Sequence, residues 1–237
     1  MSGRDPDRGD GPGCFASPPC WMHELDAEAL GFASEPDEQT RIDVTRWRNA
    51  RREHLIADRR SVPEAARAAI AARIAAHLDG LLGVLSGRTI GVYWPIHAQP
   101  DLRGWMRQAH QRGALCALPV LVGPAAPLLF RPYSPGMALD AGAGNLSAPP
   151  GGACVVPDVL LIPLVGFDEA CHGLGYGGGY YDRTLAGMMP RPFAVGVAVA
   201  RSALATVYPL PHDIPMDAIV TECGVLRRQR PREAESA

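Results

Sequence analysis

The sequence contains no lysine, because all 23 basic side chains among its 237 residues are arginines. This absence excludes a Schiff-base lysine, the lysine of a P-loop and a lysine general base. Neither sign of charge is in large excess, since the formal net charge is -2. A chain without a basic excess is poorly suited to neutralise nucleic acid or to bind an anionic membrane, so we expect neither as a partner.

Long apolar runs and paired cysteines are missing as well. No apolar segment reaches the roughly 18 residues that a membrane-spanning helix needs, and the first residues do not form a signal sequence. Six cysteines are present, but none forms a CxxC pair, which argues against a zinc site or a disulfide framework. We expect a cytoplasmic protein, and we expect it to be a monomer.

Composition divides the chain into three regions. Residues 1–40 are rich in Gly, Pro, Asp and Ser without a sustained period, which is typical of a disordered extension. Residues 41–226 should form a single α/β domain, and residues 227–237 a charged tail. Within the domain, an arginine-rich helix is predicted from Thr45 and a second helix after Pro63.

Short apolar runs alternate with helical patterns along the rest of the domain. We predict strands at 89–94, 114–121, 155–167 and 193–199, a weaker strand at 128–133, and helices at 101–113 and 180–188. Continuous apolar strands that alternate with helices are typical of a mostly parallel sheet covered on both faces. The sequence therefore predicts a three-layer αβα domain with an open, Rossmann-like sheet, whose ligands bind beyond the carboxyl ends of the strands.

The strongest local signal is a glycine-rich loop between a buried strand and a helix. It lies in LLIPLVGFDEACHGLGYGGGYYDRTLA, and its glycines are Gly175, Gly177, Gly178 and Gly179. Glycines permit positive φ, and successive N–H groups before a helix N-terminus form a nest suited to phosphate. A tight packing turn is the alternative for an isolated glycine run. The tyrosines that follow could wall a planar ligand, and Asp182 could hold a divalent cation.

This segment resembles the signature of the 5-formyltetrahydrofolate cyclo-ligase (methenyltetrahydrofolate synthetase) family. FD followed by LGYGGGYYDR is the core of the resemblance, and YWP, VLLIP and PHDIPMDAIVTE occur in the family's order. The resemblance covers about residues 45–225. It implies ATP-dependent cyclisation of 5-formyltetrahydrofolate to 5,10-methenyltetrahydrofolate, with release of ADP and phosphate. In such a reaction the protein mainly positions the groups and neutralises charge.

The resemblance also implies roles for individual residues. ATP would bind Arg48 and Arg52, which are four apart on one helix face, together with Leu174, Gly175, Tyr176, Gly177, Gly178, Gly179, Tyr180 and Tyr181. The reduced folate would lie near Trp94, Gln99, Tyr176 and Tyr180. A magnesium ion would bind Asp182 and Asp213.

Several of these residues also have simpler interpretations. Arg48 and Arg52 could belong to a solvated basic helix face. Asp213, in PHDIP, could be an ordinary turn aspartate. Trp94 could be a core or rim aromatic at a strand end.

Three residues differ from what the family has at these positions. Arg48 replaces a lysine, which keeps the charge and changes its geometry. Gln99 replaces a glutamate, and an amide cannot act as the acceptor-only carboxylate. Gly173 stands where an arginine is expected near the transferred phosphate, and the adjacent His172 could replace it in part or could be a surface histidine. His97 and His172 are left outside the predicted site.

Three functions therefore stay open from the sequence. The leading interpretation is an active cyclo-ligase. The second is a relative that binds nucleotide or folate without turnover, which the changes at Gln99 and Gly173 favour. The third is a different small-molecule kinase or phosphosugar enzyme on a similar sheet, since fold alone does not decide function.

Overall fold

The computed structural model describes residues 37–142 and 147–229. The chain separates into two units, residues 1–50 and 51–237. Helix α1 (Glu38–Arg60) begins in the first unit and continues into the second. Most of the predicted extension at 1–40 and of the tail at 227–237 lies outside the described residues.

The start of α1 differs from the prediction. The helix begins at Glu38 instead of Thr45, because Asp37 accepts the backbone N–H of Thr40 at 2.7 Å and so caps the first turn. The Thr40 N–H lowers the pKa of the Asp37 carboxyl. Residues 38–40, which were predicted to be disordered, are therefore helical.

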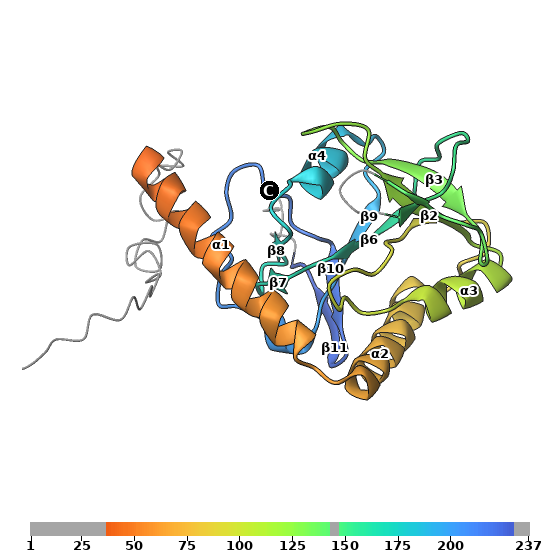
Figure 1. Cartoon of the computed structure of the whole chain (residues 1–237), viewed down its shortest axis with the longest axis horizontal. Coiled ribbons are helices and arrows are strands. Elements are labelled where there is room, and N and C mark those ends of the chain that lie inside the picture. The colour runs from red at the N-terminus through yellow and green to blue at the C-terminus, as the bar shows by residue number, and fades with distance from the viewer. Residues whose placement is uncertain (1–36, 143–146, 230–237) are drawn as a thin grey trace, which may run out of the picture. The chain divides into compact units, whose positions relative to one another are not determined.

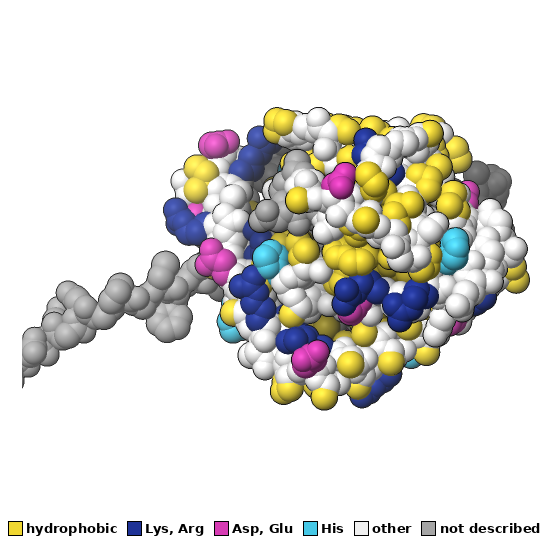
Figure 2. Space-filling view, turned by 45° about the vertical axis from the view of Figure 1, so that its right-hand side comes forward, with side chains coloured by type: hydrophobic (Ala, Val, Ile, Leu, Met, Phe, Trp, Pro, Cys, Tyr) yellow, Lys and Arg dark blue, Asp and Glu magenta, His cyan; other side chains and the backbone are white. Residues whose placement is uncertain are grey.

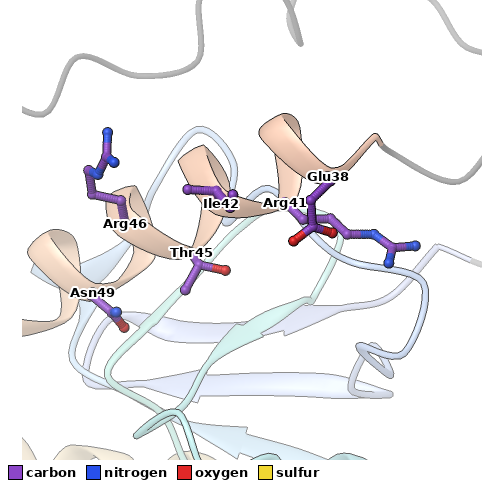
Figure 3. A pocket seen from close by; sticks show the side chains of 6 residues that line it. All are labelled: Glu38, Arg41, Ile42, Thr45, Arg46 and Asn49. Carbon is purple, nitrogen blue, oxygen red and sulfur yellow. The ribbon is translucent and has the colours of Figure 1, made fainter.

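One face of the first part of α1 lines a surface hollow of about 440 Å³ (Figure 3). The side chains come from positions three and four apart, namely Glu38, Arg41, Ile42, Thr45, Arg46 and Asn49. None of the residues predicted to bind a ligand lines this hollow.

A seven-stranded sheet forms the centre of the second unit. Its order is β11 (Gly224–Arg227), β10 (Ala218–Thr221), β9 (Phe193–Val197), β6 (Val159–Pro163), β1 (Thr89–Gly91), β2 (Leu115–Val120) and β3 (Leu129–Tyr133). The five inner strands pair in parallel, whereas β3 and β11 are antiparallel edges. The predicted open, mostly parallel sheet is confirmed.

Helices cover both faces of this sheet. They are α2 (Glu64–Leu82), α3 (Arg103–Gln111) and α4 (Tyr180–Gly187), with a short 3₁₀ helix at Ala200–Ser202. Leu161 of β6 packs in the core that contains Leu78 of α2, and its neighbour Leu160 packs in the core that contains Leu185 of α4. This alternation along one strand produces the three predicted layers, with α2 and α3 on one side and α4 on the other (Figure 1).

The order of the parallel strands reverses between β1 and β6. Along the chain β1 is followed by β2 on one side, and β6, β9 and β10 extend the sheet on the other. The carboxyl ends of β1 and β6 therefore diverge into different loops, and in open α/β sheets ligands bind in this crevice.

Some strands end earlier than predicted or were not predicted. The apolar run at 89–94 is a strand only as far as Gly91. The run at 155–167 divides into β6 and a two-residue strand, β7 (Gly166–Phe167), which pairs with β8 (Gly173–Leu174). Another small pair is β4 (Asp140–Ala141) with β5 (Ser147–Ala148). Strands β10 and β11 were not predicted.

The face of the molecule seen in Figure 2 mixes side chains of several kinds. In the space-filling view every dark-blue side chain is an arginine, and hydrophobic and acidic side chains lie between them (Figure 2). Across residues 37–142 and 147–229, no helix is both long enough and apolar enough to span a bilayer.

Candidate functional site

A cavity of about 470 Å³ lies at the carboxyl ends of β1, β2 and β6. Tyr93 and Trp94 follow β1, Leu121 follows β2, Pro163 is the last residue of β6, and Leu164 follows it. The cavity therefore occupies the crevice at which the strand order reverses, as expected for a ligand site in this kind of sheet.

Most of the predicted site residues line this cavity. They are Trp94, Gln99, Gly175, Tyr176, Gly177, Gly178, Gly179, Tyr180, Tyr181, Asp182 and Asp213. Leu174 does not, because its side chain is fully buried beside Leu55, Val165 and Val207. Arg48 belongs to the first unit, so its assignment to the site stays a prediction.

The glycine loop, residues 175–179, connects β8 to α4. Gly177 has a φ of +92° and Gly179 a φ of +61°. Gly179 is the N-cap residue of α4, so no side chain caps this helix. Both positions need the left-handed region that favours glycine. The loop thus brings backbone N–H groups and a helix N-terminus to the cavity wall, which is an arrangement that binds phosphate.

Two arginines hold carbonyl groups of the glycine loop. The Arg52 Nε donates to the carbonyl oxygen of Gly175 at 2.6 Å. The Arg183 Nη2 donates to the carbonyl oxygen of Gly178 at 2.6 Å, and its guanidinium lies 5.0 Å from the centre of the Tyr180 ring. The two guanidinium groups place positive charge beside the loop, where an anion would bind. Arg52 therefore lies beside the glycine loop, and its predicted binding of ATP stays a prediction.

Asp182 and Asp213 form a pair of carboxylates on the same wall. The Ile214 N–H donates to Asp182 Oδ1 at 3.0 Å, and the Leu210 N–H donates to Asp213 Oδ2 at 2.8 Å. Burial raises the pKa of Asp182, and the charge of Asp213 raises it further. The hydrogen bond from the Ile214 N–H acts in the opposite direction and lowers it. Two acids whose charges disfavour each other are suited to share a cation.

These two carboxylates fit magnesium better than a metal held entirely by protein. In the described ranges, no three His, Cys, Asp or Glu side chains gather into a metal site. Mg²⁺ commonly takes one or two carboxylates and fills its remaining positions with water and substrate phosphate. The residues present therefore fit that ion if a nucleotide binds beside them.

Arg59 is a buried residue of the site that the sequence did not reveal. Only 4% of its surface is exposed. Its Nε donates to the His97 carbonyl at 3.1 Å, its Nη1 to the Leu164 carbonyl at 3.2 Å, and its Nη2 to the Tyr176 hydroxyl. The helix is rich in arginine throughout, so its composition does not distinguish Arg59 from arginines on a solvated face. Its position four residues after Leu55, on the buried face, was the available signal.

Gln99 is also buried, with 6% of its surface exposed. Its Oε1 accepts the Ile96 N–H at 2.9 Å, and its Nε2 donates to the Tyr176 hydroxyl at 2.9 Å. The side chain is therefore at the predicted site, but its acceptor oxygen already bonds to its own loop.

His97 and Trp94 complete the wall beside Tyr176. The centroids of the His97 and Tyr176 rings are 5.9 Å apart, and the His97 Nδ1 is 2.5 Å from Arg60 Nη2. Burial and the two neighbouring arginines, Arg60 and Arg59, lower the pKa of His97. His97 was left outside the predicted site, yet it lines the cavity. The Trp94 ring packs edge-on against the Tyr133 ring, with a distance of 5.8 Å between the ring centroids.

Glycine is the only residue type that fits at position 173 of β8 without a shift of the Leu164 side chain. A Cβ atom there would lie 2.6 Å from Leu164 Cδ2, so an arginine would have to displace Leu164. His172 is not among the residues that line the cavity. Its backbone N–H donates to Asp168 Oδ1 at 3.0 Å, its ring Nδ1 lies 3.8 Å from the same oxygen, and the other oxygen of Asp168 accepts the Val207 N–H.

Comparisons with known proteins agree with this geometry. The model of the 5-formyltetrahydrofolate cyclo-ligase family matches residues 44–222. The 5-formyltetrahydrofolate cyclo-ligase of Mycolicibacterium smegmatis is 33% identical over 175 residues, which are 70% of this chain and 89% of that protein. The Escherichia coli protein of the same name is 33% identical over 149 residues, covering 60% of this chain and 82% of that one.

A solved structure is similar as well. The NMR structure of 5,10-methenyltetrahydrofolate synthetase from Aquifex aeolicus has a TM-score of 0.67 and 26% identity, and the match covers 79% of this chain and 96% of that one. The synthetase from Mycoplasma pneumoniae, at a TM-score of 0.62, 20% identity and coverage of 74% and 98%, supports the fold. With the family model matching well over half of the sequence, the chain belongs to the 5-formyltetrahydrofolate cyclo-ligase family.

Proposed function

We propose that this protein catalyses the ATP-dependent conversion of 5-formyltetrahydrofolate to 5,10-methenyltetrahydrofolate. The observation that carries the proposal is one cavity that combines a glycine loop, a carboxylate pair and an aromatic wall. The loop suits phosphate, the carboxylates suit a cation, and the aromatic residues suit a planar ring system. Reduced folate and ATP are thus the proposed small-molecule partners.

The reaction requires positioning more than covalent help from the protein. The formyl oxygen attacks the γ-phosphorus of ATP, the bond to the bridging oxygen breaks and ADP leaves. A second folate nitrogen then attacks the formyl carbon and gives its proton to the departing phosphate or to water, and phosphate departs with the former formyl oxygen. No step needs a lysine, in agreement with the composition.

The residues of the cavity can supply what these steps need. The glycine loop and Arg52 would hold the phosphates, and Trp94 and Tyr180 would contact the folate. Asp182 and Asp213 would hold Mg²⁺, which would neutralise phosphate charge when bound. A cytoplasmic location and a monomeric state stay predictions.

The test is turnover by the purified protein with magnesium, ATP and 5-formyltetrahydrofolate. We expect methenyltetrahydrofolate, followed by its near-ultraviolet absorbance, to appear in equal amount with ADP. Binding of both ligands without product would indicate the non-catalytic relative instead. ADP formation with a different acceptor, and none with 5-formyltetrahydrofolate, would contradict the proposal.

A further inference from the structure

Tyr176, Arg59 and Gln99 form a cluster at the cavity wall, which we call the hydroxyl clamp. We propose that Arg59 and Gln99 hold the Tyr176 hydroxyl so that it acts only as a hydrogen-bond donor toward the bound substrate. The donor would meet a carbonyl or phosphoryl oxygen. This inference rests on the proposed function for the identity of the substrates. Of these, 5-formyltetrahydrofolate brings a formyl oxygen and ATP brings phosphate oxygens.

Both neighbours of the hydroxyl are donors. A guanidinium has five N–H groups and no acceptor, so Arg59 Nη2 can only donate to the Tyr176 oxygen. The orientation of the Gln99 amide follows from its other bond, since the Ile96 N–H requires the Oε1 at 2.9 Å. The Nε2 must then face Tyr176, and it donates to the hydroxyl oxygen at 2.9 Å.

The proton of the hydroxyl is left for the cavity. With two donors on its oxygen, the phenol has no further strong accepting position. Across residues 37–142 and 147–229, the Tyr176 hydroxyl has no hydrogen bond besides these two. Tyr176 itself is 37% exposed and lines the cavity. A ligand that offers an oxygen is matched to this group, whereas a ligand N–H is not.

The clamp is in place before a ligand arrives. Arg59 and Gln99 are 4% and 6% exposed, and Arg59 is held by the carbonyls of His97 and Leu164. A preorganised donor that faces developing negative charge stabilises a transition state without reorganisation. Arg59 and Gln99 act through Tyr176 and are therefore positioning residues.

Replacing Gln99 by glutamate should reverse the clamp. One carboxylate oxygen would still accept the Ile96 N–H, but the other would face the Tyr176 oxygen without a proton. Tyr176 would then donate to the carboxylate and, with Arg59 still donating to its oxygen, present one lone pair to the cavity. A glutamate at position 99, the residue expected from the family, should therefore impair this particular chain.

The direction of the hydrogen bond can be measured without turnover. In ultraviolet Raman spectra, the intensity ratio of the tyrosine Fermi doublet is high for a phenol that accepts and low for one that donates strongly. Subtracting the spectrum of Tyr176→Phe isolates Tyr176, and the same subtraction is made in the Gln99→Glu background. We expect a lower ratio for Tyr176 in Gln99→Glu, and an unchanged ratio would refute the clamp.

Equilibrium binding separates the two sources of the acceptor oxygen. Tyr176→Phe should weaken binding of 5-formyltetrahydrofolate by about twofold to tenfold if the neutral formyl oxygen is the acceptor, or binding of Mg-ATP by about tenfold to a hundredfold if a charged phosphate oxygen is. Gln99→Glu should weaken the same ligand, and the double variant should lose little more. Gln108→Glu, which makes the same change on the exposed face of α3, is the control.

Arg59→Lys provides a second test if Gln99→Glu does not fold. Lysine keeps the positive charge but lacks the planar set of N–H donors of a guanidinium, so it cannot hold the Tyr176 hydroxyl as Arg59 does. This variant should therefore weaken binding of the same ligand as Tyr176→Phe. Unchanged affinity for both ligands in Tyr176→Phe would overturn the proposal. Absence of turnover in the unmodified protein would refute the proposed activity alone, because neither the Raman nor the binding measurement depends on it.

Discussion

At the scale of single residues, the carboxylate pair shows how a site can carry an unfavourable charge. Asp182 is partly buried and close to Asp213, and burial raises its pKa. A raised pKa means that the folded state binds the Asp182 proton more tightly than the unfolded state does. The ionised side chain therefore lowers the free energy of unfolding once the pH exceeds the ordinary aspartate value of 3.8.

We expect Asp182→Asn to stabilise the free protein at neutral pH. The amide oxygen can still accept the Ile214 N–H, and the repulsion from Asp213 is removed. The gain in the unfolding temperature should disappear as the pH falls toward 3.8. The same variant should lose the stabilisation that Mg-ATP provides. Thermal unfolding from pH 4 to 7, with exposed Asp140→Asn as the control, would measure both effects, and a variant less stable at every pH would contradict this account.

The positions of site residues were predictable where the motif is local in the sequence. The glycine loop and Asp182 lie in one short segment, and the structure places them on one cavity wall with Trp94, Gln99 and Asp213. Arg59 was missed because the sequence does not show which arginine of a basic helix turns inward. The hydrogen bond between Gln99 and Tyr176 joins residues 77 apart, and no local pattern encodes it.

At the scale of elements, the three layers depend on the alternation along β6. Every residue of this strand is buried, and successive side chains enter opposite cores. A continuous apolar run predicts such a strand, because both of its faces must be covered. The strand ends were harder to predict, since the run continues past Pro163 where Leu164 and Val165 bond to Val197 and Leu174. β10 is only four residues long and carries little pattern.

Leu161→Ala should therefore destabilise the domain without touching the cavity. Leu161 is 1% exposed within the core formed with α2 and α3, and a cavity of this kind costs about 2 to 5 kcal/mol. Chemical denaturation would measure the loss. Leu129→Ala, on the edge strand β3 where the side chain is 42% exposed, should cost much less. Equal losses in the two variants would contradict the layer assignment.

At the scale of the whole molecule, ligand binding and folding should be linked. The cavity draws on the ends of three strands, the glycine loop and α4, so only the assembled domain can bind. A ligand that binds the folded state alone stabilises it by about 2.7 kcal/mol at one hundred times its Kd.

We expect Mg-ATP to raise the unfolding temperature in proportion to the logarithm of its concentration. Arg52→Gln should move this dependence to higher concentration, because Arg52 bonds to the glycine loop. Arg73→Gln, at an exposed position of α2, should leave it unchanged. Differential scanning calorimetry would measure both, and identical curves for the two variants would remove Arg52 from the site.

The bonds of Arg59 also bear on how the protein reaches its native state. They join this residue to partners 38, 105 and 117 positions further along the chain. Contacts of such long sequence separation form late, because the closure entropy of large loops must be overcome first. We therefore expect the hydroxyl clamp to assemble late, so that recovery of substrate affinity during refolding lags behind recovery of helical structure.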